Sequence, residues 1–251
     1  MKNYVELEHF LTNSLQQSVL KEGFSRVVFG LSGGLDSAVV ALLAKKAFKD
    51  NHLCLLMPSF TSNESSLNDA KNLCENHNLN YEIIDISPTV LSYVNKKDMN
   101  ELRVGNFTSR VRMSVLYDIS ARENALVLGS SNKSEILLGY GTHYGDFACA
   151  INPIGDIYKS DLFDFASFLG VDENIIKKPP SADLWRGQSD EDELGFSYKK
   201  IDELLRAYEK SGFNVEKMDR GSFEKRLYDT IMSRVKNNRF KRELPLVLKL
   251  K

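Results

Sequence analysis

The chain reads Arg26-Val27-Val28-Phe29-Gly30-Leu31-Ser32-Gly33-Gly34-Leu35-Asp36-Ser37 over residues 26–37. Its first half is short, β-branched and apolar, which predicts a strand buried on both faces. The following residues, 36–48, are almost wholly apolar and predict a helix at the centre of the protein. A buried strand that turns through glycine into a buried helix is the unit of a parallel α/β sheet.

The flanking sequence repeats this alternation. It predicts helices over residues 3–22, 63–77 and 104–123, and strands over residues 53–57, 81–86 and 126–128. Strands that alternate with helices predict an α/β fold with a doubly wound parallel sheet flanked by helices and right-handed crossovers.

The sequence changes character after about residue 150. A helix is expected over residues 161–169, then an extended stretch over 177–180 and an acidic, flexible segment over 187–193. Two further helices are expected, one carrying Ile201, Leu204, Leu205 and Tyr208 on one face and one over 222–236. We therefore expect a single domain, 1–251, with a helical C-terminal extension.

The composition of the chain limits the classes of protein to which it can belong. The 251 residues are 42% apolar and 27% charged, as in soluble globular proteins, and the net charge of −1 argues against nucleic acid as a partner. The three cysteines fit neither a disulfide framework nor a metal motif. The N-terminus lacks a signal-peptide core, and no apolar run reaches membrane-spanning length. We expect a cytoplasmic protein without a membrane partner.

The glycine turn has the features of a phosphate-binding loop. Adjacent glycines let backbone N–H groups approach a ligand, and the N-terminus of the next helix adds donors and partial positive charge. Ser32 and Ser37 add hydroxyls, and Asp36 adds a carboxylate that could hold Mg²⁺. The alternative is an ordinary turn in which Asp36 or Ser37 caps the helix, but six specified positions at a strand-to-helix switch favour a ligand site. The lysine of a Walker A loop is missing.

Ser32-Gly33-Gly34-Leu35-Asp36-Ser37 resembles the pyrophosphate loop of the N-type ATP pyrophosphatases. That superfamily includes NAD synthetase, GMP synthetase, asparagine synthetase and tRNA-thiolating enzymes. The resemblance implies an adenine nucleotide alpha hydrolase-like fold. It also implies cleavage of ATP between its α and β phosphates with adenylation of the acceptor.

Four further blocks resemble the NAD synthetases in particular. They are 105–113, similar to GN-x-x-x-R-x-R-M; 129–146, similar to GT-x-x-x-x-E…G-x-x-T-x-x-GD; 151–159, similar to NPL-x-x-L-x-K; and 179–195, with Pro179-Pro180-Ser181-Ala182-Asp183-Leu184 and Gln188-Ser189-Asp190-Glu191. These blocks follow one another in order over nearly the whole chain. They imply the final step of NAD biosynthesis, in which deamido-NAD is adenylated by ATP and amidated by ammonia.

The resemblance assigns residues to ATP and to the metal. Asp36 and Glu135 would hold Mg²⁺, and Lys159 would offset charge on the phosphates. Without the resemblance, Glu135 would be interpreted as a solvated helix charge and Lys159 as a surface lysine. The complete set of expected ATP-binding residues is Gly30, Leu31, Ser32, Gly33, Gly34, Leu35, Asp36, Ser37, Met57, Ser130, Lys159 and Ser181.

A second set is expected to bind deamido-NAD: Asn106, Phe107, Arg110, His143, Asp146 and Lys241. Arg110 suits a phosphate, and Phe107 could stack on the nicotinate ring or pack in the core. Asp146 is expected to steer or deprotonate ammonium, but a Gly-Asp turn explains it as well. We expect the catalytic residues to be Asp36, Lys159 and Asp146.

The chain departs from the family pattern at several positions. Ser131-Asn132-Lys133-Ser134 replaces a frequent Asp-His-Ala-Ala, His143 replaces a lysine, and Phe240 replaces the histidine of a C-terminal His-Lys. Glutamine-using relatives carry an additional amidase domain, so free ammonia is expected here, with a separate glutaminase subunit left open. The resemblance also implies a homodimer. The alternatives are another ATP pyrophosphatase, such as a tRNA thiolase or GMP synthetase subunit, and a non-catalytic nucleotide-binding module.

Overall fold

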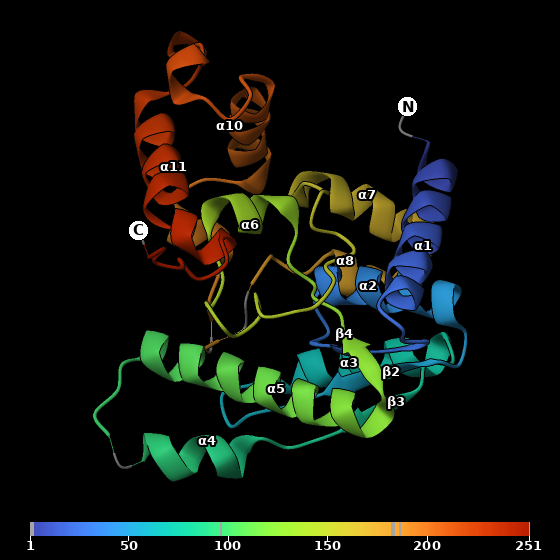
Figure 1. The fold of residues 1–251 in the computed structure, drawn as a ribbon. Helices are drawn as coiled ribbons and strands as arrows, with labels where there is room; N and C mark the ends of the chain where they lie inside the picture. The colour runs from blue at the N-terminus through green and yellow to red at the C-terminus, as the bar shows by residue number, and fades with distance from the viewer. Residues whose placement is uncertain (1–2, 96, 182–183, 186, 251) are drawn as a thin grey trace.

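The structure is a computed structural model, and it describes residues 3–95, 97–181, 184–185 and 187–250. Its core is a four-stranded parallel sheet in the order β3-β2-β1-β4 (Figure 1). The strands are β1 (Arg26–Gly30), β2 (His52–Leu56), β3 (Tyr81–Ile83) and β4 (Ala125–Val127). The predicted α/β class and the parallel, doubly wound sheet are confirmed.

Side chains that alternate along the strands face two different layers. Val27 and Phe29 of β1 pack in one apolar cluster with α1 (Tyr4–Lys21), α2 (Leu35–Phe48), α3 (Glu64–Asn76), α7 (Lys159–Leu169) and α8 (Glu173–Ile176). Val28, between them, packs in a second cluster with α4 (Ser87–Val94) and α5 (Glu101–Glu123). Figure 1 shows α4 and α5 on one face of the sheet and α1, α2 and α7 on the other. Since α2 is covered by the sheet, α1 and α7, it can be apolar on nearly every side.

The order of the strands reverses direction at one place in the sheet, between β1 and β4. From β1 the chain adds β2 and then β3 on one side, and β4 on the other side of β1. The carboxyl ends of β1 and β4, which are paired in parallel, therefore lie side by side at the topological switch point, where open α/β sheets bind ligands. Residues 30–37, the predicted phosphate loop and called the phosphate loop below, and the segment 129–135 leave the sheet at this point.

The C-terminal extension forms a separate apolar cluster. α10 (Tyr198–Lys210) and α11 (Lys225–Asn237) pack against each other and against α6 (Lys133–Leu138) through Ile201, Leu204, Leu205, Ile231 and Leu138, all fully buried. The short turns η1 (Val215–Lys217), η2 (Arg220–Ser222) and η3 (Arg239–Arg242) complete this region. The predicted helical extension is confirmed.

Two predictions of local structure were incomplete. The acidic segment 187–193, expected to be flexible, overlaps the helix α9 (Asp190–Leu194), in which Asp190 is buried. The expected strand 81–86 ends at Ile83, although Ile84 and Ile86 still donate to the carbonyls of Leu56 and Pro58, and α4 follows at once. Asp190 of α9 accepts from the hydroxyls of Tyr140 and Tyr198, contacts that the local pattern of residues 187–193 does not contain.

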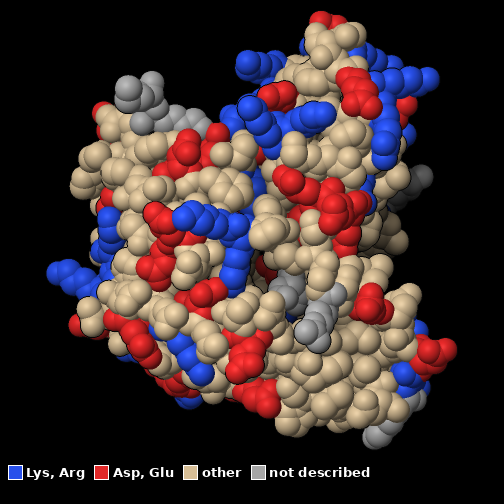
Figure 2. All heavy atoms as spheres, turned by 180° about the vertical axis from the view of Figure 1, so that it is seen from behind, with Lys and Arg blue, Asp and Glu red and all other residues tan. Residues whose placement is uncertain are grey.

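The surface carries charges of both signs. On the face in Figure 2, Lys and Arg are interspersed with Asp and Glu over both the sheet layer and the C-terminal helices. Across the described residues, no helix is both long enough and apolar enough to span a bilayer.

Candidate functional site

The phosphate loop is held in shape by its own hydroxyls. Ser37 Oγ accepts from Ser32 N at 3.2 Å and donates to Gly34 O at 3.0 Å, and it lies 3.0 Å from Ser32 Oγ. Gly34, the N-cap of α2, provides no side-chain acceptor for the first N–H groups of the helix. These groups are the donors that a helix N-terminus offers to an anion.

Gly33 is required both by conformation and by space. Its φ is +79°, which favours glycine, and an added Cβ would lie 2.0 Å from the carbonyl oxygen of Ser66 in α3. Gly33, the first glycine of the motif at residues 32–37, thus lets the loop lie directly against α3. The sequence predicted that these glycines let a ligand approach the backbone, and Gly33 also permits the close contact with Ser66 of α3.

Three charged residues meet beside the loop, and we call Asp36, Glu135 and Lys159 the acid–lysine cluster. Lys159 Nζ makes a short ion pair with Asp36 Oδ2 and lies 3.9 Å from Glu135 Oε1. The Lys159 side chain is only 4% exposed, and each carboxylate is 17% exposed. The interpretations of Lys159 as a surface lysine and Glu135 as a solvated charge are therefore wrong.

The pKa values in the cluster reflect burial and the neighbouring charges. Burial, followed by the negative charge of Asp36, raises the pKa of Glu135 well above its usual range. Burial alone would lower the pKa of Lys159, but the charges of Asp36 and Glu135 outweigh it and raise that pKa. Lys159 therefore stays protonated between two carboxylates.

The donor set fits a hard divalent cation that also has phosphate ligands. Two carboxylates lie at the switch point, and the pKa of Glu135 is raised by burial and by the charge of Asp36, so a positive charge would stabilise the pair. The described residues contain no group of three or more His, Cys, Asp or Glu side chains able to hold a metal. Asp36 and Glu135 could therefore supply only part of a coordination shell, with oxygen atoms of a bound phosphate ligand supplying more.

Asn132 joins the two carboxylates, and sequence reasoning did not assign it a role. Its Nδ2 donates to Asp36 Oδ1 at 2.9 Å, and its Oδ1 accepts from Glu135 N at 3.0 Å. Asn132 N in turn donates to Glu135 Oε2 at 3.2 Å, which completes a capping box at the start of α6. The Asn-x-x-Glu spacing in the sequence was the signal that could have identified this cap.

Of the remaining expected ATP residues, three follow the carboxyl ends of strands and one follows α8. Met57 follows β2 and is buried, and a Cβ added at Gly30 would lie 3.4 Å from its Cε. Ser130 follows β4, and Leu31 is buried at the end of β1. Ser181 is exposed in the stretch after α8, and Ala182 and Asp183 of the same motif lie outside the described residues.

A second group of side chains surrounds the loop formed by residues 139–147. Asn106 Oδ1 accepts from Thr142 Oγ1 at 2.8 Å, and Arg110 Nε donates to His143 O at 3.2 Å. From the other side, Lys241 Nζ donates to the carbonyls of Gly139 and Gly141, each at 2.9 Å. Five of the six expected deamido-NAD residues thus meet at this loop: Asn106, Arg110, His143, Asp146 and Lys241.

Asp146 and Phe107 have additional structural contacts. Asp146 Oδ1 accepts from Ser109 Oγ at 2.8 Å and from Thr142 N at 2.9 Å, so this carboxylate braces the turn. Phe107 packs against Tyr93 of α4, with ring centroids 4.7 Å apart. The alternative of a Gly-Asp turn for Asp146 and the alternative of core packing for Phe107 thus each describe a contact that the structure contains.

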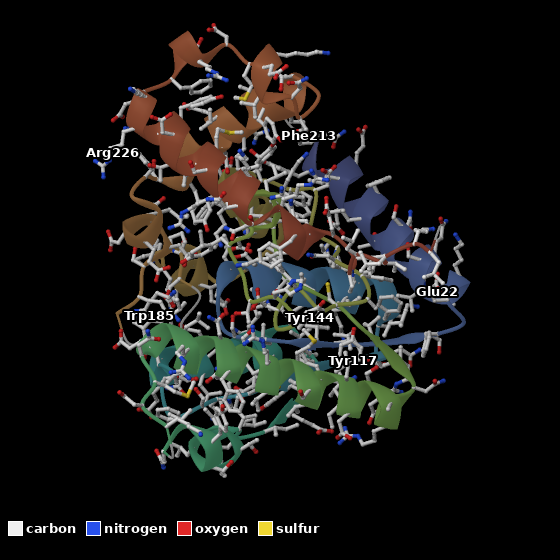
Figure 3. The ribbon with its side chains drawn as sticks, turned by 60° about the vertical axis from the view of Figure 1, so that its left-hand side comes forward. Glu22, Tyr117, Tyr144, Trp185, Phe213 and Arg226 are labelled. Carbon is white, nitrogen blue, oxygen red and sulfur yellow. The ribbon has the colours of Figure 1, made fainter. Side chains whose placement is uncertain are left out.

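Two positions that depart from the family pattern are neighbours in space. The His143 ring lies 5.5 Å from the Phe240 ring and 3.9 Å from Tyr144. Figure 3 shows Tyr144 between α5 and the C-terminal elements, and Trp185 beside α5. The replacements at 143 and 240 therefore form one aromatic contact on the edge of the loop.

Comparisons with known proteins agree with this arrangement. The family model described as NAD synthase matches residues 7–245. The NH(3)-dependent NAD(+) synthetase of Campylobacter jejuni is 49% identical over 237 residues, which cover 94% of this chain and 95% of the relative. That of Fusobacterium nucleatum is 44% identical over 251 residues, covering 99% and 97%.

Solved structures give the same result. The NMN synthetase from Francisella tularensis superimposes with a TM-score of 0.89 at 32% identity, over 100% of both chains. The C. jejuni NH3-dependent NAD synthetase in complex with nitrate gives 0.85 at 40% identity, over 99% of this chain and 100% of that one. With its glycine loop and acid–lysine cluster at the switch point of the sheet, the chain belongs to the NAD synthase family.

Proposed function

We propose that this protein is a ligase that amidates deamido-NAD with ammonia, using ATP and releasing AMP and pyrophosphate. The observation that carries the proposal is the acid–lysine cluster beside a glycine loop at the switch point of the sheet. The similarity to NH(3)-dependent NAD(+) synthetases over nearly the whole chain supports the acceptor and the nitrogen source.

The reaction has two steps. A carboxylate oxygen of the nicotinate attacks the α-phosphorus of ATP, and pyrophosphate leaves with the electrons of the broken P–O bond. Ammonia then attacks the acyl carbon, AMP leaves, and the new amide nitrogen loses a proton. Both reactants are anionic, so the loop N–H groups and the Lys159 ammonium would offset their repulsion and align them.

Mg²⁺ belongs to this proposal. Asp36 and Glu135 would hold it, and it would supply charge neutralisation on the phosphate oxygens. Before ATP binds, Lys159 balances the two carboxylates.

The loop at residues 139–147 is the proposed site of the dinucleotide. Arg110 and Lys241 supply positive charge, and Asn106, Phe107 and His143 supply hydrogen-bonding and stacking groups. We assign Asp146 to steering or deprotonating ammonium, in addition to its bonds within the turn. We further propose a homodimer that acts in the cytoplasm.

Nicotinate mononucleotide is the second candidate acceptor. It is favoured by one observation, the close superposition on a structure described as an NMN synthetase. The higher identity to NAD synthetases favours deamido-NAD.

One assay decides between these acceptors. The protein is incubated with ATP, Mg²⁺, ammonium and one of deamido-NAD, nicotinate mononucleotide or xanthylate, and AMP and the amide product are measured. We expect the highest kcat/KM with deamido-NAD, and Asp36→Ala should abolish turnover without unfolding the protein. Absence of NAD would refute the leading proposal, and preference for the mononucleotide would select the second.

A further inference from the structure

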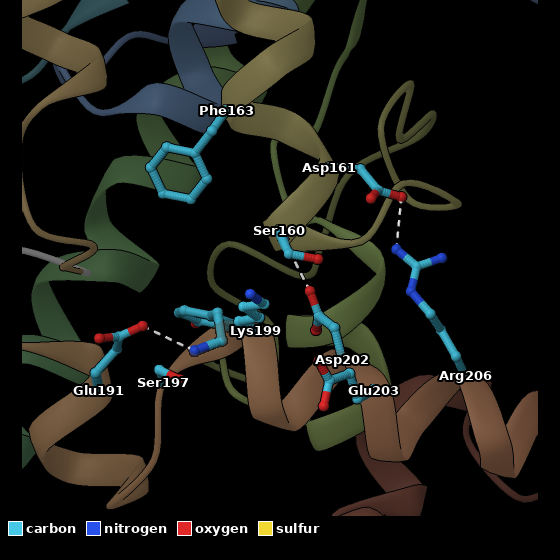
Figure 4. Close-up of a pocket in the computed structure, with 10 residues that line it drawn as sticks. Ser160, Asp161, Phe163, Glu191, Ser197, Lys199, Asp202, Glu203 and Arg206 are labelled. Atoms are coloured by element: carbon cyan, nitrogen blue, oxygen red, sulfur yellow. Dashed lines mark hydrogen bonds and ion pairs between the residues drawn. The ribbon is translucent and has the colours of Figure 1, made fainter. Parts of the chain in front are cut away.

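The N-terminus of α7 is capped by residues from two other helices. Lys159 is the first residue of α7, and the N-cap residue Tyr158 makes no side-chain cap bond. Instead, Lys159 N donates to Ser134 Oγ of α6 at 3.0 Å. Ser160 N donates to Asp202 Oδ2 of α10 at 2.8 Å, a contact visible in Figure 4.

The two caps are themselves connected. Ser134 Oγ donates to Asp202 Oδ1 at 2.5 Å, so one carboxylate receives both a hydroxyl and a backbone N–H. Ser134 is fully buried and Asp202 is 1% exposed. A carboxylate at a helix N-terminus is stabilised by the helix dipole, and its donors would lose their partner in a buried place if it were removed.

This chain of bonds leads to the proposed reaction centre at two points. The backbone N–H of Lys159 is capped by Ser134, and the side-chain ammonium of the same residue belongs to the acid–lysine cluster. Ser134 directly precedes Glu135, the second carboxylate of the cluster. The segments that present Lys159 and Glu135 are therefore joined directly by the bond from Lys159 N to Ser134, and the Asp202 side chain of the C-terminal extension holds both of them.

We propose that Asp202, acting through Ser134, is a positioning residue for Lys159 and Glu135. This inference rests on the proposed function, in which Lys159 offsets charge on the phosphates of ATP. It assigns the C-terminal extension a part in the reaction: α10 fixes the starting points of α6 and α7 relative to the phosphate loop. Displacement of a charged group by about 1 Å can cost about 100-fold in rate, so the constraint has a measurable consequence.

The chain offers a matched control at the same helix contact. Arg206 Nη2 of α10 donates to Asp161 Oδ2 of α7 at 2.7 Å, and both residues line the pocket drawn in Figure 4. This pair joins the same two helices through side chains alone. Its loss leaves the acceptors of Lys159 N and Ser160 N in place.

The test compares Asp202→Ala, Asp202→Asn, Ser134→Ala and Asp161→Asn in the full-length chain. Steady-state NAD formation gives kcat and the KM for ATP, and thermal unfolding gives Tm. We expect Asp202→Ala to lower kcat by at least about tenfold with little change in the KM for ATP. Asp202→Asn keeps one acceptor oxygen and should recover most of kcat, and Ser134→Ala should give a smaller loss than Asp202→Ala.

Asp161→Asn should lower Tm but leave kcat unchanged. A wild-type kcat in folded Asp202→Ala would overturn the positioning role. A lower kcat that accompanies the lower Tm in Asp161→Asn would overturn it as well. If Asp202→Ala does not fold, Ser134→Ala decides, and an unchanged kcat there overturns the inference. Wild-type protein that makes no NAD would instead refute the proposed function itself, and this inference with it.

Discussion

At the scale of single residues, Gly33 is a position where one methyl group should matter greatly. Gly33 and Gly23 both have φ near +80°, but only at Gly33 would a Cβ meet another atom, the Ser66 carbonyl at 2.0 Å. A left-handed conformation costs a non-glycine residue about 1–2 kcal/mol. We expect Gly23→Ala to lose that amount of unfolding free energy and Gly33→Ala to lose more.

The two variants should differ in function as well. The backbone of Gly33→Ala must move away from α3, which would displace the N–H groups of the phosphate loop. We therefore expect a raised KM for ATP in Gly33→Ala and an unchanged one in Gly23→Ala, measured by NAD formation and urea unfolding. Equal stability losses in the two variants would contradict the role of the α3 contact.

Asn132 permits a second prediction at this scale. Asn132→Asp keeps the acceptor for Glu135 N but places a third carboxylate against Asp36. Like charges about 4 Å apart repel by about 1–4 kcal/mol in an environment between water and a protein surface. We expect a lower Tm at neutral pH and a lower kcat.

Asn132→Ser is the control, because serine is a good N-cap without the added charge. It should keep most of the Tm that Asn132→Asp loses. A Tm for Asn132→Asp equal to that of the wild type would argue against close contact between residues 132 and 36.

At the scale of elements, α6, α7 and α10 are joined by a network of charges around Tyr158. Lys133 Nζ lies 2.5 Å from Glu209 Oε1 and 2.8 Å from Asp156 Oδ1. The Tyr158 hydroxyl donates to Glu209 Oε2 at 2.9 Å, and Lys133 Nζ and Arg206 lie 5.0 and 4.2 Å from the Tyr158 ring centroid. Glu209 is therefore a shared acceptor between three helices.

This network predicts a pH dependence of stability. The Lys133 hydrogen bond lowers the pKa of Glu209 below its ordinary value. A lowered pKa in the folded state stabilises the protein above the unfolded pKa, about 4.3, and this stabilisation is lost as the pH falls through the folded value. Glu209→Gln should therefore lower the unfolding free energy at pH 7 by less than about 1 kcal/mol, and the difference should vanish in more acidic solution.

The exposed pair of Lys177 and Glu173 is the control for this experiment. Their side chains are 73% and 79% exposed, so Glu173→Gln should change stability little at any pH. The measurement is urea unfolding of both variants and the wild type at several pH values. A difference for Glu209→Gln that persists at acid pH would exclude the carboxylate as its cause.

At the scale of the whole molecule, the sheet layer and the C-terminal extension share elements. Leu162 and Phe165 of α7 belong to the main apolar cluster, whereas Tyr158 and Leu138 belong to the cluster around α10 and α11. The extension can therefore not separate without uncovering apolar surface on α6 and α7. We expect one cooperative unfolding transition for 1–251.

The single tryptophan makes this expectation measurable. Trp185 lies beside α5, so its fluorescence reports on the sheet layer, while far-UV circular dichroism reports on all helices, α10 and α11 included (Figure 3). The two signals should change at the same urea concentration. An earlier loss of helicity would show that the extension unfolds independently.

The sequence by itself determined the order of the strands and helices of the sheet, the central helix and the glycine turn between β1 and α2. Local periodicity and glycine spacing specify these elements, because a buried strand and a buried helix need apolar residues at fixed intervals. The family resemblance also named Asp36, Glu135 and Lys159, which the structure brings together.

Tertiary structure alone decided what holds those three residues in place. Asn132 bridges the two carboxylates, and Asp202, 43 residues beyond Lys159 in the chain, connects Ser134 to the start of α7. It also decided that the acidic segment before Gly195 forms α9 around the buried Asp190. Hydrogen bonds between distant residues leave no periodic pattern in a sequence, because their partners are set by how the helices pack and not by their spacing along the chain.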